Sequence, residues 1–213
     1  KNYHVTGGAR SIKPTDLWRL NELKIRDKLE IIKFELNDKN IINNVIKDGK
    51  YHEIYNLAAQ SFVDKSYINP IDTSNSNAIA VVYILEAIRK FSKKTKFYQA
   101  SSSEMYGNIK SKIQNEKTNF LPVSPYAVSK LYAHYMVSLY RDAYNLYCCS
   151  GILFNHESPL RSEEFVTKKI ISQLIKVKLN LLPHVKLGNI YAKRDWGYST
   201  DYVEAMWKML QLK

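Results

Sequence analysis

Residues 95–107 read TKFYQASSSEMYG, and residues 124–144 read SPYAVSKLYAHYMVSLYRDAY. The apolar and aromatic residues of 95–102 indicate a strand. Ser124 and Pro125 are typical of a helix start, so a helix is expected over 126–144. A strand that leads into a long helix is the repeating unit of α/β folds.

The same alternation of strand and helix runs along the rest of the chain. Strands are expected over 3–8, 29–36, 51–59, 95–102 and 146–155 and near 185–190. Helices are expected over 37–49, 70–92, 126–144, 165–179 and 201–212, and 107–123 is expected to be a long surface loop. This order predicts an α/β fold, a Rossmann-like doubly wound parallel sheet with helices on both faces.

The composition restricts the classes of partner and ligand that are expected for the chain. The net charge is +12, but the lysines are spread out and no nucleic-acid motif occurs, so no nucleic acid is expected. No apolar run reaches the roughly 18 residues that a membrane span needs. Cys148 and Cys149 lie in an apolar run and are expected as buried thiols, which fits a reducing cytoplasm. The five histidines show no ligand spacing, so no metal is expected.

Ligands of doubly wound sheets bind beyond the carboxyl ends of the strands. Tyr126 and Lys130 are spaced i, i+4 and share one face of the expected helix. A lysine there is expected to lower the pKa of Tyr126, which could then act as a general base. A hydroxyl of the serines at 101–103 could donate to the same substrate oxygen. Taken alone, the Tyr-x-x-x-Lys spacing is more typical of a surface pair.

The combined arrangement resembles the extended short-chain dehydrogenase/reductase family of the NAD(P)-binding Rossmann superfamily. Within it, several stretches resemble the GDP-mannose 4,6-dehydratase family, almost from end to end: YNLAAQS, FYQASSSEMYG, SPYAVSKLYA, GILFNHESP, FVTKKI, LGN and RDWGYSTDYVEAMWKMLQ. The resemblance implies a lyase that converts GDP-mannose to GDP-4-keto-6-deoxy-mannose and water by internal hydride transfer through NADP. This reaction belongs to nucleotide-sugar metabolism and GDP-fucose biosynthesis.

The resemblance also implies the site residues. The implied catalytic residues are Ser102, Glu104, Tyr126 and Lys130. Glu104 would remove the C5 proton, which a 4,6-dehydratase needs and a C4 epimerase does not. Cofactor contacts are implied for Arg10, Glu35, Leu36, Leu57, Ala58, Ala59, Gln60, Ser61, Tyr126, Lys130, His156 and Arg161. Substrate contacts are expected from Asn155, Val166, Lys169 and Arg194.

The cofactor type follows from the end of the second strand of a dinucleotide fold, where an arginine accommodates the 2′-phosphate of NADP. Arg10 stands at that point with no acid nearby, so NADP is expected rather than NAD.

One feature of the family pattern is absent from the chain, namely the glycine-rich turn that holds pyrophosphate. We therefore expect a fold truncated at both ends, without the first βα unit. Residues 1–155 are expected to form a partial NADP-binding Rossmann domain with the catalytic residues. Residues 156–213 would form part of a substrate-binding region interleaved with the last Rossmann elements. The chain by itself is expected to bind NADP weakly or not at all.

Alternatives to the dehydratase stay open at this point. The absent phosphate turn favours an inactive fold remnant or binding scaffold, and another nucleotide-sugar epimerase or dehydratase is also compatible with the pattern. In the full-length form, the family resemblance implies a homo-oligomer, either a dimer or a tetramer.

Overall fold

The computed structural model of the chain describes residues 3–108 and 113–212. It divides into two compact units. The first comprises residues 1–152 together with 209–213, and the second comprises residues 153–208. The expected loop 107–123 is therefore described except for 109–112.

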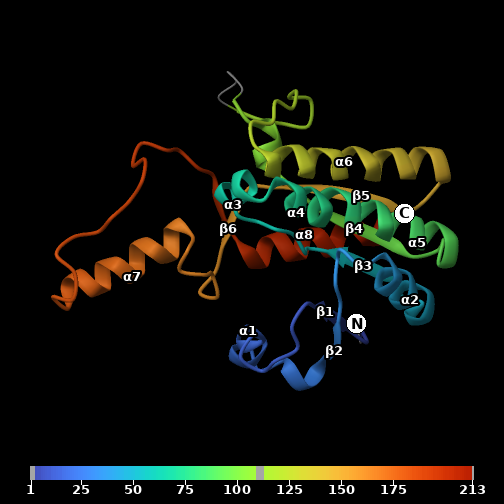
Figure 1. Cartoon of the computed structure of the whole chain (residues 1–213), viewed down its shortest axis with the longest axis horizontal. Coiled ribbons are helices and arrows are strands. Elements are labelled where there is room, and N and C mark those ends of the chain that lie inside the picture. The colour runs from blue at the N-terminus through green and yellow to red at the C-terminus, as the bar shows by residue number, and fades with distance from the viewer. Residues whose placement is uncertain (1–2, 109–112, 213) are drawn as a thin grey trace. The chain divides into compact units, whose positions relative to one another are not determined.

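The first unit alternates strands and helices as the sequence predicts (Figure 1). Its strands are β1 (Thr6–Ala9), β2 (Glu30–Lys33), β3 (Glu53–Asn56), β4 (Lys96–Ser102) and β5 (Cys148–Leu153). Its helices are α1 (Trp18–Glu22), α2 (Lys39–Gly49), α3 (Val63–Ile68), α4 (Pro70–Ser74), α5 (Ala80–Phe91) and α6 (Pro125–Tyr144). Shorter turns are η1 (Arg26–Lys28), the π-helical η2 (Asn75–Ile79) and η3 (Ser103–Tyr106).

The strands of this unit form two separate sheets. β1 pairs with β2 in parallel, with Thr6 opposite Glu30. β3 pairs with β4 in parallel, with Glu53 opposite Lys96, and β5 lies on the other side of β4. In doubly wound sheets the first strand lies between the second and the fourth. The described chain has no strand at that place, so β1 and β3 do not meet, in agreement with the expected absence of the first βα unit.

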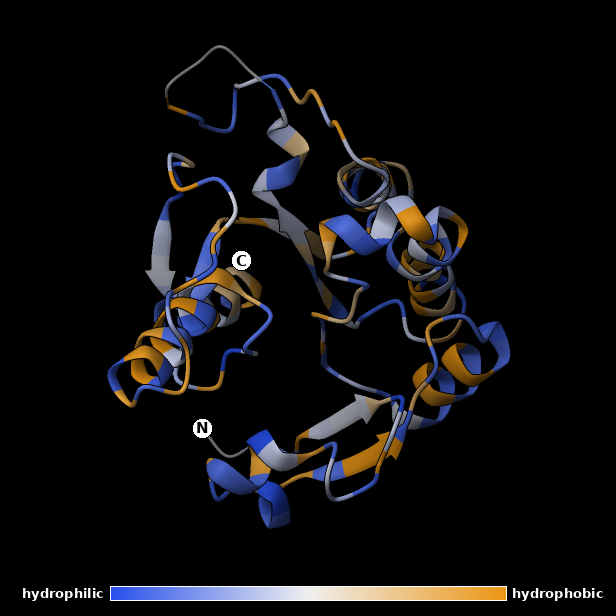
Figure 2. Cartoon of the chain, turned by 60° about the vertical axis from the view of Figure 1, so that its left-hand side comes forward, coloured by the Kyte–Doolittle hydropathy of each residue, from blue (hydrophilic) through white to orange (hydrophobic). Residues whose placement is uncertain are grey.

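The core of the first unit lies between β4 and the helices α2, α5 and α6. It contains the fully buried Phe97 of β4 and apolar residues of the helices such as Ile42, Leu85 and Val137. Hydrophobic and hydrophilic segments alternate along the helices (Figure 2), because each helix has one face toward the core and another toward solvent.

Two side chains fix where the long helices begin. The Asp38 carboxylate accepts hydrogen bonds from the backbone N–H groups of Asn40 and Ile41 at 2.8 and 3.0 Å, and so caps α2. The Ser124 hydroxyl accepts the Ala127 N–H at 3.0 Å at the start of α6. Asn145 ends α6 in the left-handed conformation, with φ of 54°. The boundaries of α6 are therefore encoded locally.

The second unit contains β6 (Asn155–Glu157), α7 (Val166–Lys178), β7 (Trp196–Tyr198) and most of α8 (Ser199–Gln211). β6 and β7 pair in parallel, with His156 opposite Gly197. The prediction of a strand near 185–190 is wrong, because these residues form turns and irregular backbone, and all but Val185 are exposed. The apolar residues there have no strand to pair with, and β6 is instead paired by 196–198.

The described residues contain no helix both long enough and apolar enough to cross a bilayer. Within 3–108 and 113–212, no cluster of three or more His, Cys, Asp or Glu side chains is placed to hold a metal ion.

Candidate active site

The end of β4 and the first turns of α6 bring three of the predicted catalytic residues together. Ser102 is the last residue of β4, and Tyr126 and Lys130 lie one turn apart on α6. All three side chains are buried, with exposed fractions of 8%, 8% and 4%. The spacing i, i+4 places Tyr126 and Lys130 on the helix face that packs against the strand.

Lys130 is a buried cation. Its Nζ donates to the carbonyl oxygen of Ala100 at 3.1 Å and lies 5.9 Å from the centroid of the Tyr126 ring. Burial disfavours the charged form and lowers the pKa of Lys130 to about 8. The ammonium is held by the strand, one residue before the two serines that end it.

The pKa of Tyr126 is shifted in the direction opposite to the one expected from the sequence. Burial raises this pKa, the Ser102 hydroxyl beside the phenol opposes the rise, and the charge of Glu104 adds to it. The prediction that Lys130 lowers the pKa of Tyr126 is therefore wrong for this structure. The physical reason is that Lys130 lies over the ring and is hydrogen-bonded to Ala100, so desolvation of the phenol dominates.

Glu104 lies in η3, the turn that begins directly after Ser102. The Ser102 hydroxyl oxygen accepts the backbone N–H of Glu104 at 3.2 Å, and the hydroxyl hydrogen is directed to the Tyr126 phenol. The turn ends at Gly107, whose φ of 56° is left-handed, and a Cβ there would collide with the carbonyl oxygen of Leu121. The turn thus carries the partly buried Glu104, whose charge acts on the buried phenol of Tyr126.

The segment Leu57–Ser61 follows β3, so it lies at the same edge of the sheet as Ser102. Leu57, Ala58 and Ser61 are exposed, while Ala59 and Gln60 are partly buried. The Asn77 side chain holds Gln60, accepting its N–H at 2.8 Å and donating to its carbonyl oxygen at 2.9 Å. The sequence reading missed Asn77, because no local pattern relates it to Gln60.

The remaining predicted cofactor residues of the first unit follow β1 and β2. Arg10 comes directly after β1 and is exposed. Glu35 is partly buried, and its carboxylate accepts the backbone N–H of Asn37 at 3.3 Å. The Leu36 side chain belongs to the hydrophobic core, so only its backbone is available for a ligand.

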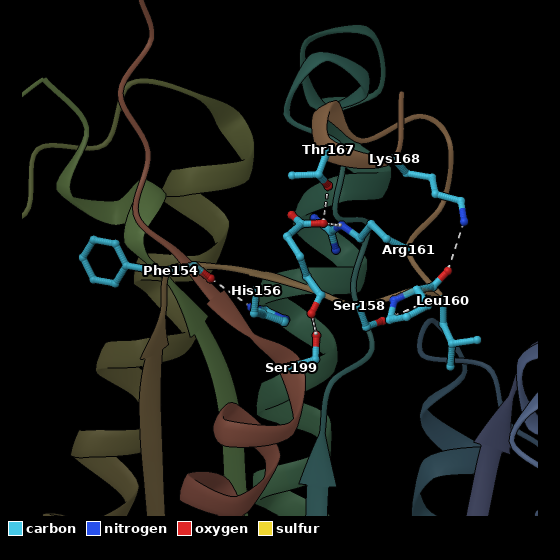
Figure 3. Close-up of polar contacts among 10 residues, drawn as sticks. Phe154, His156, Ser158, Leu160, Arg161, Thr167, Lys168 and Ser199 are labelled. Atoms are coloured by element: carbon cyan, nitrogen blue, oxygen red, sulfur yellow. Dashed lines mark hydrogen bonds and ion pairs between the residues drawn. The ribbon is translucent and has the colours of Figure 1, made fainter. Parts of the chain in front are cut away.

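In the second unit, Arg161, Thr167 and Ser199 belong to a cluster of polar contacts (Figure 3), and all three contact Glu157. The Glu157 carboxylate lies 3.2 Å from Nε of Arg161 and accepts the Thr167 hydroxyl at 2.6 Å. The Ser199 hydroxyl donates to the Glu157 carbonyl oxygen at 3.0 Å. Arg161 also lies 3.5 Å above the centroid of the Phe165 ring. Arg161 is therefore held in place by contacts within its own unit.

The other predicted residues of this unit are spread over several elements. Asn155 and His156 belong to β6, and the His156 ring lies 2.9 Å from the Phe154 carbonyl oxygen through Nδ1 and 4.9 Å from the Tyr202 ring. Val166 begins α7 and is exposed, and Lys169 lies one turn later, partly buried. Arg194 is exposed in the irregular segment before β7.

A serine at a strand exit, facing a Tyr-x-x-x-Lys helix on a Rossmann-like sheet, defines a domain of the short-chain dehydrogenase/reductase class. Solved structures agree in fold. The dTDP-glucose 4,6-dehydratase of Bacillus anthracis, in complex with NAD, matches with a TM-score of 0.83 at 24% identity, over 98% of this chain and 63% of that one. The UDP-glucuronic acid 4-epimerase of Bacillus cereus matches with a TM-score of 0.84 at 22% identity, over 99% and 66%.

Sequence comparison identifies the family. The family described as GDP-mannose 4,6 dehydratase matches residues 1–213, and the chain belongs to this family. The GDP-mannose 4,6 dehydratase of Drosophila melanogaster is 43% identical over 99% of this chain and 55% of its own length. The enzyme of Sinorhizobium fredii is 48% identical over 83% and 51%, and that of Homo sapiens 41% identical over 99% and 59%. The chain thus spans between half and three fifths of the length of these relatives.

Proposed function

We propose that the protein containing this chain dehydrates GDP-mannose to GDP-4-keto-6-deoxy-mannose and water. Family membership supports the substrate. The observation that carries the chemistry is the position of Glu104, whose N–H is bound by the hydroxyl oxygen of Ser102. This bond fixes the backbone of Glu104 against Ser102, whose hydroxyl would bind the 4-oxygen of the sugar, and the charge of Glu104 acts on Tyr126.

NADP is the proposed cofactor. The residues present fit a nicotinamide dinucleotide in part, because Lys130 uses one of its three ammonium hydrogens on Ala100 and keeps two for a ribose. Arg10 is exposed beyond β1, where a 2′-phosphate would be read. Glu35, the backbone of Leu36, and Leu57–Ser61 would line the rest of the cofactor at their strand exits. When bound, the nicotinamide would accept a hydride from C4 and return it to C6.

The chain's own groups would move the protons. Ser102 donates its hydroxyl hydrogen to the 4-oxygen, and Tyr126, as the phenolate, accepts the proton of the 4-hydroxyl. The 4-ketone makes the C5 proton acidic, and Glu104 removes it. The electrons of the C5–H bond form a C5–C6 double bond as the C6–O bond breaks, and the leaving hydroxide takes the proton from Glu104 and departs as water. After hydride has been returned to C6, C5 takes up a proton from solvent through Glu104. Lys130 supplies a positive charge 5.9 Å from the centroid of the Tyr126 ring.

Residues of the second unit are proposed to bind the rest of both ligands. Asn155, Val166, Lys169 and Arg194 would contact the sugar nucleotide, with the guanidinium fork of Arg194 suited to its diphosphate. His156 and Arg161 would contact the cofactor. The division of labour between 1–155 and 156–213 stays a prediction.

The protein is further proposed to be a cytoplasmic homo-oligomer. Both cysteines are free thiols, which fits a reducing compartment, although only Cys148 is buried and Cys149 is partly exposed. α6 exposes Val128, Tyr132, Tyr135 and Leu139 along one side, each between 43% and 57% accessible. An apolar face of this extent is typical of a surface between subunits.

The test uses the full-length protein, incubated with GDP-mannose and with NADP or NAD in heavy water. We expect a product lighter than the substrate by one water, formed faster with NADP. Because Glu104 exchanges the proton at C5, the product should carry deuterium at C5. Glu104→Gln should lower the rate by a factor of about 10² or more. Glu116→Gln removes an exposed loop carboxylate and should act like the parent protein.

Other outcomes would contradict the proposal in separate ways. A product isomeric with the substrate would indicate an epimerase. Unreacted GDP-mannose, with cofactor bound, would point to another sugar or to a binding scaffold. Equal rates for the parent and Glu104→Gln would show that Glu104 takes no part in the reaction, but they would not contradict GDP-mannose as the substrate.

A further inference from the structure

Three residues of α6 hold three successive residues at the end of β4. Tyr126, Lys130 and His134 are spaced i, i+4, i+8, so they follow one another along a single side of the helix. Tyr126 lies beside Ser102, and Lys130 binds the carbonyl oxygen of Ala100. The third member, His134, lies 3.0 Å through Nδ1 from the hydroxyl oxygen of Ser101.

The contact between His134 and Ser101 is made one residue before the end of β4. Ser101 is 3% exposed and is directly followed by Ser102, which caps the turn that carries Glu104. His134 is partly buried, and burial lowers its pKa, so the neutral imidazole is the form that meets Ser101. Depending on the tautomer, Nδ1 accepts from or donates to the hydroxyl, and either arrangement fixes the strand end.

The same imidazole supports the far end of the turn. The Phe120 ring meets His134 edge-on, with ring centroids 5.5 Å apart and planes at 73°. Phe120 in turn packs on Tyr106, the last residue of η3, at 5.1 Å. The N–H of the next residue, Leu121, donates to the Met105 carbonyl oxygen at 3.1 Å. His134 is therefore linked to both ends of the segment that carries Glu104.

We propose that His134 is a positioning residue for Glu104. It holds the start of the turn through Ser101 and the end of the turn through Phe120, and it touches neither substrate nor cofactor. The inference rests on the dehydratase function proposed above, since Glu104 has a catalytic role only there. A carboxylate that must reach the C5 proton needs a fixed backbone, because small misplacements of a catalytic group cost large factors in rate.

The test compares four variants of the full-length protein. His134→Phe keeps an aromatic ring against Phe120 but removes the nitrogen, and His134→Asn places an amide near the position of Nδ1. Ser101→Ala removes the other partner, and the fourth variant combines Ser101→Ala with His134→Phe. His52→Phe changes an exposed histidine and serves as the control.

We expect His134→Phe to lower kcat about tenfold or more with little change in KM for GDP-mannose. His134→Asn should recover most of this loss. Ser101→Ala should lower kcat similarly, and the double variant should be no slower than the slower single variant, because both changes remove one contact. Additive losses, or a wild-type kcat in His134→Phe, would overturn the proposal even if stability fell.

Hydrogen exchange separates this inference from the dehydratase function. The backbone amides of residues 103–106 should exchange faster in His134→Phe than in the parent, and His134→Asn should restore their protection. This result, together with a parent protein that forms no dehydrated product, would keep the positioning contact and reject the proposed function. Unchanged exchange in an active protein would reject the positioning role and leave the function standing.

Discussion

At the scale of single residues, the most unusual group of the site is the buried ammonium of Lys130. It is 4% exposed and has Ala100 as its hydrogen-bond partner rather than a carboxylate. An isolated buried charge destabilises a fold, and a lysine responds by losing its proton more easily. The pKa of Lys130 accordingly falls from 10.5 to about 8. A cation maintained at this cost indicates a ligand-directed role more than a contribution to stability.

Stability measurements can test the state of Lys130. Its folded pKa lies below its unfolded pKa, so the unfolded state binds the proton more tightly, and the free energy of unfolding rises as the pH increases from about 8 to 10.5. The gain amounts to about 3 kcal/mol at most, and Lys130→Met should lack it. Urea unfolding at each pH measures the free energy of unfolding of both proteins. We expect this free energy to rise in the parent relative to Lys130→Met between about pH 8 and 10.5.

A matched variant separates this effect from general alkaline changes. Lys117→Met removes an exposed loop lysine and should show the same pH dependence as the parent protein. Tyr98 and Cys148, whose pKa values are raised by burial, affect the parent and both variants alike. A constant difference between parent and Lys130→Met from pH 7 to 10.5 would show that Lys130 is solvated.

At the scale of elements, α6 has two faces with different tasks. Its inner side carries Tyr126 and Lys130 and then the core residues Ala133, Val137 and Tyr140. Its outer side is apolar, and residues 131–140 include no lysine, arginine, aspartate or glutamate. In a chain with a net charge of +12, an uncharged face is the surface on which two copies can meet with least repulsion.

The proposed subunit contact predicts a change in assembly for a charge placed on this face. Leu139 is 50% exposed on the outer side of α6, and Leu139→Lys would bring two like charges together across a symmetric interface. We expect the full-length variant to have a lower molar mass by light scattering than its parent. Leu181→Lys adds the same charge at an exposed site of the second unit and should leave the mass unchanged. Equal masses for all three proteins would exclude this face.

The elements also show which features a sequence can predict. β4 and α6 were predicted within one residue, because their apolar patterns are long and the start of α6 is set by Ser124 and Pro125. The expected helix 70–92 is divided into α4, η2 and α5, and α1 was missed because its apolar pattern is short. The prediction of a strand near 185–190 was wrong, because a strand needs a pairing partner and the local sequence does not specify one.

The candidate site was predictable to a similar degree. The spacing of Tyr126 and Lys130, and the place of Ser102 at a strand exit, were correct because helix period and strand order determine them. The direction of the Tyr126 pKa shift was wrong because burial depends on the whole fold. The partnerships of Asn77 with Gln60 and of His134 with Ser101 join distant segments, so local reasoning could not find them.

At the scale of the whole chain, the two compact units are not consecutive in sequence. Residues 209–213 return to the first unit after the second has been completed. The Lys96 ammonium donates to the Leu210 carbonyl oxygen at 2.6 Å, and the Gln211 amide donates to the Glu53 carboxylate at 2.9 Å. These bonds attach the end of α8 to β4 and β3. Lys96 and the core residue Phe97 are successive in β4, and successive side chains of a strand point to opposite faces of the sheet. Because Lys96 binds Leu210, the end of α8 lies on the sheet face opposite the core helices (Figure 1).

This arrangement makes the stability of the first unit depend on the last turn of α8. Leu210 is fully buried, so Leu210→Ala should lower the free energy of unfolding of this unit by about 2–5 kcal/mol. Leu212 is 66% exposed, and Leu212→Ala should change that free energy by less than about 0.5 kcal/mol. Hydrogen exchange of the β4 amides in the full-length protein measures both effects. Because β4 ends at Ser102, the weaker protection in Leu210→Ala should reach the site itself, and equal protection in both variants would show that the first unit is complete without α8.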